Sequence, residues 1–137
     1  MFAVVDTGAL VAAAVESDPL HAQVAAALLD AGFDYIIPAM CVAEAAYLIA
    51  RDLGPEREAV FLESLRSADV IAPEADDWVR IGALVRHYGD FPLGGTDASV
   101  VALAERLATD VIVTLDHRHF RAIKPRHCEF FRLLPEL

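Results

Sequence analysis

The chain opens with Phe2-Ala3-Val4-Val5-Asp6-Thr7, a short apolar run that stops at an acid and a hydroxyl. Such a run predicts a buried strand that ends in a polar turn. Residues 111–115, followed by Asp116, repeat this order near the other end of the chain. Helical patterns and short apolar runs alternate between the two stretches, which is typical of a parallel sheet covered by helices on both faces. We therefore predict the α/β fold class.

The remaining elements are predicted from their periodicity and from their start and stop signals. Asp18-Pro19 is typical of a helix start, with Asp18 as the cap, and this helix is expected to end near Gly32. A helix is also expected directly after Thr7, a loop over 89–95, and further helices over 40–52, 56–67, 76–88 and 96–107. Strands are expected over 35–38, 70–72 and, at the sheet edge, 129–133.

The length of 137 residues fits one ordinary domain, 1–137, with a substantial core. The hydrophobic content of 56% is high, so some apolar surface is expected to meet a partner. No apolar run approaches the roughly 18 residues that span a bilayer, and the first residues lack the basic start of a signal peptide. We therefore expect a cytoplasmic protein without a membrane segment.

Charge and metal-ligand spacing narrow the function classes. The two cysteines and five histidines show no zinc-binding spacing, so a zinc site is not expected. The net charge of −10 argues against a protein that grips nucleic acid over its whole surface. Five of the 11 basic residues nevertheless fall within 117–132, where only Glu129 opposes them. This segment is either a patch that meets phosphates or a solvated face.

Four acids are expected to meet at one edge of the sheet. The carboxyl ends of parallel strands and the amino ends of the following helices share that edge. Asp6 and Asp116 follow strands, while Asp97 and Glu44 lie in the first turns of helices. Taken singly, Asp6, Asp97 and Asp116 have ordinary explanations as turn residues, caps or partners of a helix dipole.

Glu44 is harder to explain in this way, since it is the only charged residue within 36–50. We expect its carboxylate to be carried into the interior, where an unpaired charge is costly. A hard cation is the natural partner, and carboxylate oxygens with water suit Mg²⁺ or Mn²⁺. Such an ion polarises a phosphoryl group and activates a water, which is the chemistry of phosphodiester hydrolysis.

The same residues resemble the motifs of a known family. Val4-Val5-Asp6-Thr7-Gly8-Ala9-Leu10 is similar to the opening signature of PIN domains, and Val42-Ala43-Glu44 to their second acidic site. Gly94-Gly95-Thr96-Asp97-Ala98 and Thr114-Leu115-Asp116-His117-Arg118-His119-Phe120 resemble the third and the fourth. The resemblance covers essentially the whole chain, and the last motif is especially similar to the VapC toxins.

The resemblance implies a PIN-like α/β/α sandwich and a Mg²⁺- or Mn²⁺-dependent endoribonuclease that cleaves RNA with a metal-activated water. It also implies a homodimer and a VapB antitoxin that covers the acidic site. Asp6 and Asp97 would be the main metal ligands, Glu44 a third ligand or an orienter of water, and Asp116 a ligand of a second or water-bridged ion. Thr7 and Thr114 would orient these carboxylates. The chain departs from the family pattern at Gly8, where many relatives have Ser or Ala. Asp90 matches an acid that is common in the family, and we interpret its role as structural.

Two other function classes compete with this interpretation. Phosphotransferases that use an Asp nucleophile also follow a first strand with Asp-Thr, but they place a second Asp where this chain has Gly8. The stronger alternative is a catalytically silent PIN-like module that binds RNA or protein.

Partner and substrate surfaces are expected near the acids. The apolar stretches 9–15 and 40–50 either form core or receive an antitoxin or a second copy of the chain. An antitoxin Arg or Lys that reached the acids would compete with the metal for them. Candidates for the RNA-binding rim are Tyr88, Phe91, Phe120 and the basic residues near Arg118, and the sequence does not name the RNA.

Overall fold

The predicted alternation of strand and helix produces a five-stranded, wholly parallel sheet. The computed structural model describes all 137 residues. The strand order across the sheet is β3-β2-β1-β4-β5. The strands are β1 (Phe2–Val5), β2 (Asp34–Pro38), β3 (Asp69–Ile71), β4 (Val111–Val113) and β5 (Arg132–Leu134). The strands that precede Asp6 and Asp116, β1 and β4, thus lie side by side at the centre of the sheet, with Val4 opposite Ile112.

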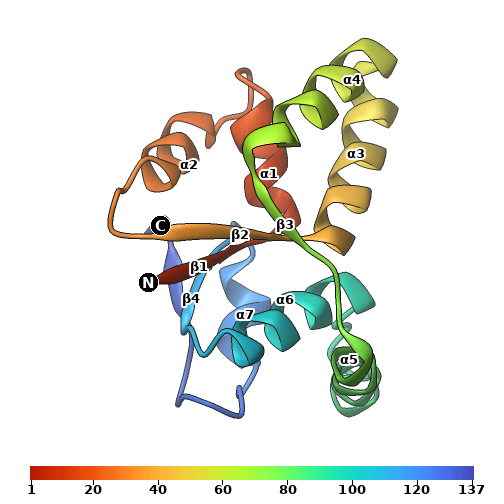
Figure 1. Ribbon diagram of the computed structural model, residues 1–137, viewed down its shortest axis with the longest axis vertical. Helices are drawn as coiled ribbons and strands as arrows, with labels where there is room; N and C mark the ends of the chain where they lie inside the picture. The colour runs from red at the N-terminus through yellow and green to blue at the C-terminus, as the bar shows by residue number, and fades with distance from the viewer.

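Helices cover both faces of this sheet. α1 to α4 lie on one side, and α5 to α7 lie on the other (Figure 1). The helices are α1 (Thr7–Ala14), α2 (His21–Leu28), α3 (Ala39–Leu53), α4 (Pro55–Ser64), α5 (Ala75–His87), α6 (Gly95–Arg106) and α7 (His117–Ala122), with a 3-10 turn at Leu65–Ser67. The predicted α/β/α sandwich with a parallel sheet is confirmed. No helix has both the length and the apolar character needed to cross a bilayer.

Several predicted boundaries were displaced. The helix expected from Asp18 begins at His21, because Asp18 caps a turn before it by accepting the backbone N–H of Leu20 at 2.9 Å. The last strand covers Arg132–Leu134 instead of 129–133. The short helix α7 follows Asp116 directly and was not predicted as an element.

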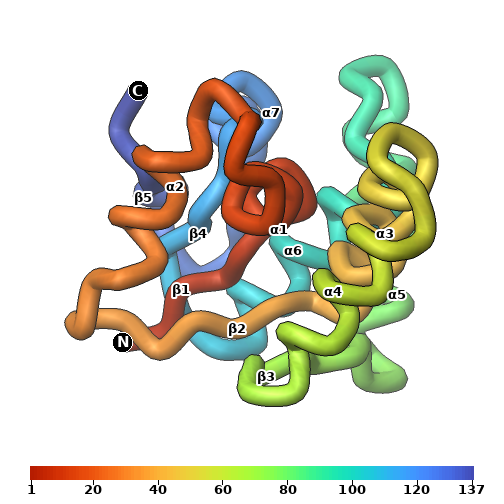
Figure 2. Tube along the Cα trace, turned by 90° about the horizontal axis from the view of Figure 1, so that it is seen from above, coloured from red at the N-terminus to blue at the C-terminus, as the bar shows by residue number.

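The core explains why two of the helices are so apolar. α6 packs against α5, β1 and β2 and buries every residue from Ala98 to Ala104. α3 lies beside α4 on the opposite layer, as the view from above shows (Figure 2), and it also contacts α1. α6 carries Asp97 and α3 carries Glu44, so the packing of α6 and of the inner face of α3 fixes the backbone from which both carboxylates project.

Candidate active site

The four predicted acids line one pocket. Asp6, Glu44, Asp97 and Asp116 border a cavity of about 530 Å³ at the carboxyl edge of the sheet. They come from the end of β1, from α3, from the start of α6 and from the turn after β4. No lysine, arginine or histidine is among the lining residues. The pocket therefore concentrates negative charge without a basic side chain on its walls.

Asp6 is the most deeply placed of these acids, with only 4% of its surface exposed. Its backbone N–H bonds Val113 O at 2.9 Å, which seats it at the junction of the two central strands. Burial, followed by the nearby Asp97 carboxylate, raises the pKa of Asp6 from 3.8 to about 7. The protein alone therefore stabilises the ionised Asp6 carboxylate only poorly.

Asp97 is half-buried in the first turn of α6, where the helix dipole favours a negative charge. Its pKa is nevertheless raised, first by burial and then by the charges of Asp116 and Glu44. Burial, together with the repulsion among these acids, thus outweighs the local support from the helix terminus. A cation between them would relieve that repulsion.

Glu44 is exposed, so the expectation that it is carried into the interior was wrong. α3 turns Cys41, Ala45 and Ile49 toward the core, while Glu44 lies on the open side of the helix. The absence of other charges within 36–50 misled the prediction, because alanines and a tyrosine also tolerate the exposed face. Glu44 still lines the acidic pocket.

Asp116 caps α7. One carboxylate oxygen, Oδ1, accepts the backbone N–H of His119 at 3.1 Å, and the other, Oδ2, lies 2.5 Å from Nδ1 of the His119 ring. Both oxygens thus have partners within the protein, unlike those of the exposed Glu44. Asp116 combines the cap role that its sequence position allows with a place on the pocket wall.

The two threonines behave differently. Thr114 donates a hydrogen bond to Asp6 Oδ2 at 2.9 Å and accepts one from the Asp116 backbone N–H at 3.0 Å, so one buried hydroxyl connects two of the acids. The Thr7 hydroxyl is buried on the pocket wall and has no hydrogen-bond partner. The side chain of Thr7 therefore does not orient a carboxylate in the predicted way.

The pocket also contains an acid that sequence reasoning assigned elsewhere. Asp18 lines the same cavity, although its position suggested only a helix cap. Asp18 does cap a turn, because its carboxylate accepts the backbone N–H of Leu20, but this turn lies before the helix. Nothing in the sequence distance between Asp18 and the other acids indicates that they share a cavity.

The rim candidates divide into buried and accessible residues. Phe120 is fully buried and packs against Phe131, so its assignment to the rim was wrong. Phe91 is half-buried and packs against His119, with ring centroids 4.8 Å apart, next to Asp116. Tyr88 is half-buried and accepts the backbone N–H of Lys124 through its hydroxyl. The five basic residues of 117–132 are all exposed: Arg118, Arg121, Lys124, Arg126 and Arg132.

The donor set suits a hard divalent cation. The raised pKa of Asp6 and the unpartnered Thr7 hydroxyl both mark polar groups that the protein leaves undersatisfied. No three of the acidic, histidine or cysteine side chains converge closely enough to hold an ion by themselves. Mg²⁺ typically uses one or two carboxylates and retains several waters, so the spaced carboxylates of this pocket fit such an ion.

Comparison with known proteins agrees with this geometry. A family model of the PIN domain matches residues 3–124. The chain therefore belongs to the PIN domain family. It is 34% identical over 137 residues to Ribonuclease VapC26 of Mycobacterium tuberculosis, covering 96% of this chain and 99% of that relative. The resemblance to the VapC group is thus confirmed.

Solved structures show the same fold at lower sequence identity. The chain matches VapC20 of M. tuberculosis, described as a sarcin–ricin loop cleaving toxin, with a TM-score of 0.73 and 14% identity over 80% of this chain and 86% of that one. It matches VapBC2 of Rickettsia felis, bound to a DNA fragment from its promoter, with a TM-score of 0.72 and 17% identity over 98% of this chain and 100% of that one. FitAcB of Neisseria gonorrhoeae gives a TM-score of 0.56 and 20% identity over 82% of this chain and 86% of that one.

Proposed function

We propose that the protein is an endoribonuclease that hydrolyses RNA phosphodiester bonds with Mg²⁺ or Mn²⁺, and that it acts as the toxin of a VapBC-type toxin–antitoxin pair. The observation that carries the proposal is the acidic pocket, whose walls hold Asp6, Glu44, Asp97 and Asp116 and no basic side chain. The name of the relative VapC26 supports the choice of RNA as substrate.

Asp6 and Asp97 are the proposed main metal ligands. Both have raised pKa values that trace first to burial and then to repulsion by neighbouring acids, which is the electrostatic situation that a cation reverses. A bound divalent cation supplies charge neutralisation and polarisation of the phosphoryl group. The Thr114 hydroxyl holds the Asp6 carboxylate in place through a hydrogen bond. His119 contacts the carboxylate of Asp116, which lines the same pocket.

Glu44 is the proposed acceptor of a proton. Its exposed carboxylate faces the pocket, so it is placed to orient an attacking water and to take its proton. The water oxygen would then form the bond to phosphorus as the bond to the bridging oxygen of the leaving RNA fragment breaks, and a proton from solvent would complete the hydroxyl of that fragment. The exposed Arg118, close in sequence to Asp116, is a candidate contact for the flanking RNA phosphates.

The test is cleavage of total cellular RNA with Mg²⁺ or Mn²⁺, followed by sequencing of the new 5′ ends. We expect discrete cuts that disappear with a chelator and with Asp97→Asn. Asp90→Asn is the matched control, because Asp90 is an exposed acid just before α6 that does not line the pocket. If wild type made no cuts beyond those seen with Asp97→Asn, the acids would not be a catalytic site, and the silent RNA- or protein-binding module would be favoured instead.

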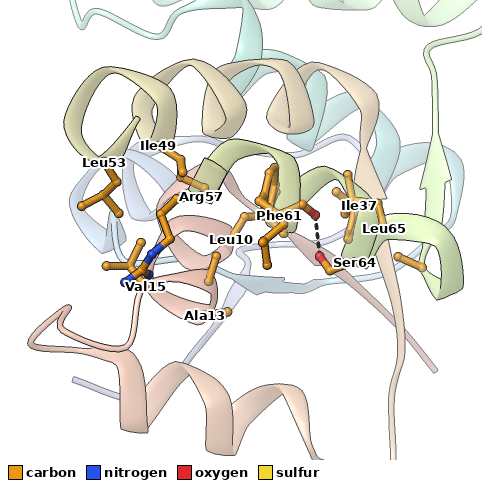
Figure 3. A pocket seen from close by; sticks show the side chains of 13 residues that line it. Leu10, Ala13, Val15, Ile37, Ile49, Leu53, Arg57, Phe61, Ser64 and Leu65 are labelled. Carbon is orange, nitrogen blue, oxygen red and sulfur yellow. Dashed lines mark hydrogen bonds between the residues drawn. The ribbon is translucent and has the colours of Figure 1, made fainter. Parts of the chain in front are cut away.

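The partner is proposed to be an antitoxin of the VapB type that lies in an apolar groove. The groove has a volume of about 350 Å³ and is bordered by α1, α3 and α4. Leu10, Ile49 and Phe61 point into it, and Arg57 stands at its edge (Figure 3). The groove uses parts of the stretches 9–15 and 40–50, and other residues of these stretches, such as Ala12 and Ala45, belong to the core.

We also propose that two copies of the chain form a homodimer. Tyr47, Trp78 and Val79 are large apolar or aromatic side chains that are more than half exposed and lie outside the groove. They are candidate contacts between two copies of the chain. Sedimentation at micromolar concentration would measure the mass, and a monomer there would contradict this part of the proposal.

A further inference from the structure

Cys41 is a buried thiol that contacts Asp6, one of the acids that line the pocket. It lies on α3, has no exposed surface, and its Sγ is 4.0 Å from Oδ1 of Asp6. A free thiol carries its proton at neutral pH, so Cys41 can act as a weak donor toward this oxygen. Asp6 therefore receives one side-chain donor on each oxygen, the thiol on Oδ1 and the Thr114 hydroxyl on Oδ2.

The two donors differ in strength and in the elements that carry them. The Thr114 hydroxyl follows β4 and bonds at 2.9 Å, whereas the thiol belongs to α3 and is a weak donor at long range. Glu44 stands three residues after Cys41, one helical turn further along the same helix. The thiol contact thus links the helix that carries Glu44 directly to the Asp6 carboxylate.

We propose that Cys41 is a positioning residue of the active site, whose S–H fixes the rotamer of Asp6 and the register of α3 so that Asp6 and Glu44 face the pocket together. This inference rests on the proposed metal-dependent function. A weak donor restrains the carboxylate without satisfying it, so Asp6 keeps its affinity for a cation. Residues behind a metal ligand commonly change metal affinity by about 10- to 100-fold when they are replaced.

The experiment compares Mn²⁺ binding by calorimetry for wild type, Cys41→Ser, Cys41→Val and Cys41→Ala. Ser keeps a donor at this site, Val keeps volume without a donor, and Ala keeps neither. We expect Ser to bind within about threefold of wild type and Val and Ala to bind about tenfold more weakly. Thermal unfolding of each metal-free variant identifies any that do not fold, and Cys128→Ala is the control for a cysteine outside the pocket.

The order of the variants decides between positioning and packing. If Cys41 only fills space, Val binds Mn²⁺ like wild type and Ser does not, which overturns the inference while leaving the proposed function intact. If wild type itself binds no Mn²⁺, both the inference and the metal-dependent function fail. The rate of RNA cleavage over a range of Mn²⁺ concentrations gives a second readout. A positioning defect raises the Mn²⁺ concentration for half-maximal cleavage more than it lowers the maximal rate.

Discussion

At the scale of single residues, the burial of Asp6 makes the stability of the metal-free protein depend on pH. Its pKa is 3.8 as an exposed group and about 7 in the folded chain, so the folded state binds more protons between these values. The free energy of unfolding therefore falls as pH rises through this window. At about 1.4 kcal/mol per pKa unit, the loss is on the order of 4 kcal/mol. The raised pKa of Asp97 acts in the same direction.

Denaturant unfolding in chelator at pH 4.5, 6 and 8 measures this effect. We expect wild type to lose stability across the series and Asp6→Asn to lose much less, because the amide does not ionise. Asp69→Asn, which changes an exposed acid outside the pocket, should keep the wild-type slope. Equal slopes for wild type and Asp6→Asn would show that Asp6 is not the titrating group.

Thr114 is expected to control how firmly Asp6 is held. Thr114→Val removes the hydroxyl that connects Asp6 Oδ2 with the Asp116 backbone, while the shape of the side chain is kept. We expect RNA cleavage to fall about 10-fold or more and the Mn²⁺ requirement to rise. Thr109→Val is the matched control, since the Thr109 hydroxyl bonds Phe2 O away from the pocket and its loss should affect stability alone. The prediction fails if both variants cleave RNA at the same rate.

The sequence located these acids better than it described their surroundings. The rule that strand ends and helix starts share an edge brings Asp6, Asp97 and Asp116 together, because it depends only on topology. The exposure of Glu44 and the burial of Phe120 depend on which way each helix faces, which short apolar stretches do not define. The contact between Cys41 and Asp6 joins residues 35 positions apart and has no local signal.

At the scale of elements, the position of Asp97 depends on how α6 is attached to α5. Arg106 bonds the buried Asp77 at 2.8 Å and Glu74 at 3.2 Å, while Arg80 forms two bonds to Glu105. Arg106→Ala would leave the Asp77 carboxylate with only the backbone N–H of Glu74. We expect a loss of about 2 kcal/mol in the free energy of unfolding, measured in urea.

The control for this prediction is an ion pair with no structural role. Arg51 pairs with Asp52, its neighbour in sequence, and both side chains are more than half exposed. Arg51→Ala should therefore change stability by less than about 0.5 kcal/mol. Equal effects of the two substitutions would mean that the pairs between α5 and α6 contribute no more than a surface pair.

The accuracy of the predicted elements follows their periodicity. The long helices α3, α5 and α6 lie within a few residues of their expected ranges because each repeats its apolar pattern over several turns. The six-residue α7 has too few turns to show a period, and it begins at the cap that Asp116 provides. Short elements at functional edges are defined by such contacts more than by propensity.

At the scale of the whole molecule, the acidic pocket and the apolar groove share two walls. Leu10 lines the groove and Val11 the pocket on α1, and Ile49 and Leu48 divide in the same way on α3. One helix pair therefore separates a site for a charged substrate from a surface suited to an apolar segment. If a polypeptide bound in the groove extended past α1 and α3 into the pocket, a basic side chain on it would compete with the metal for the carboxylates.

This arrangement predicts that partner binding and catalysis can be separated by a single substitution. Val60 lines the groove but is 55% exposed, so Val60→Asp should leave the free protein folded and its RNA cleavage unchanged. A bound antitoxin would bury the new charge against the mostly apolar lining of the groove, and removing it from water is costly even with Arg57 three residues away on α4. We expect the concentration of co-expressed VapB-type antitoxin that halves RNA cleavage to rise at least about 10-fold. Leu29→Asp, at the exposed residue that follows α2 and outside the groove, should be inhibited like wild type, and equal inhibition of Val60→Asp would show that the antitoxin binds elsewhere.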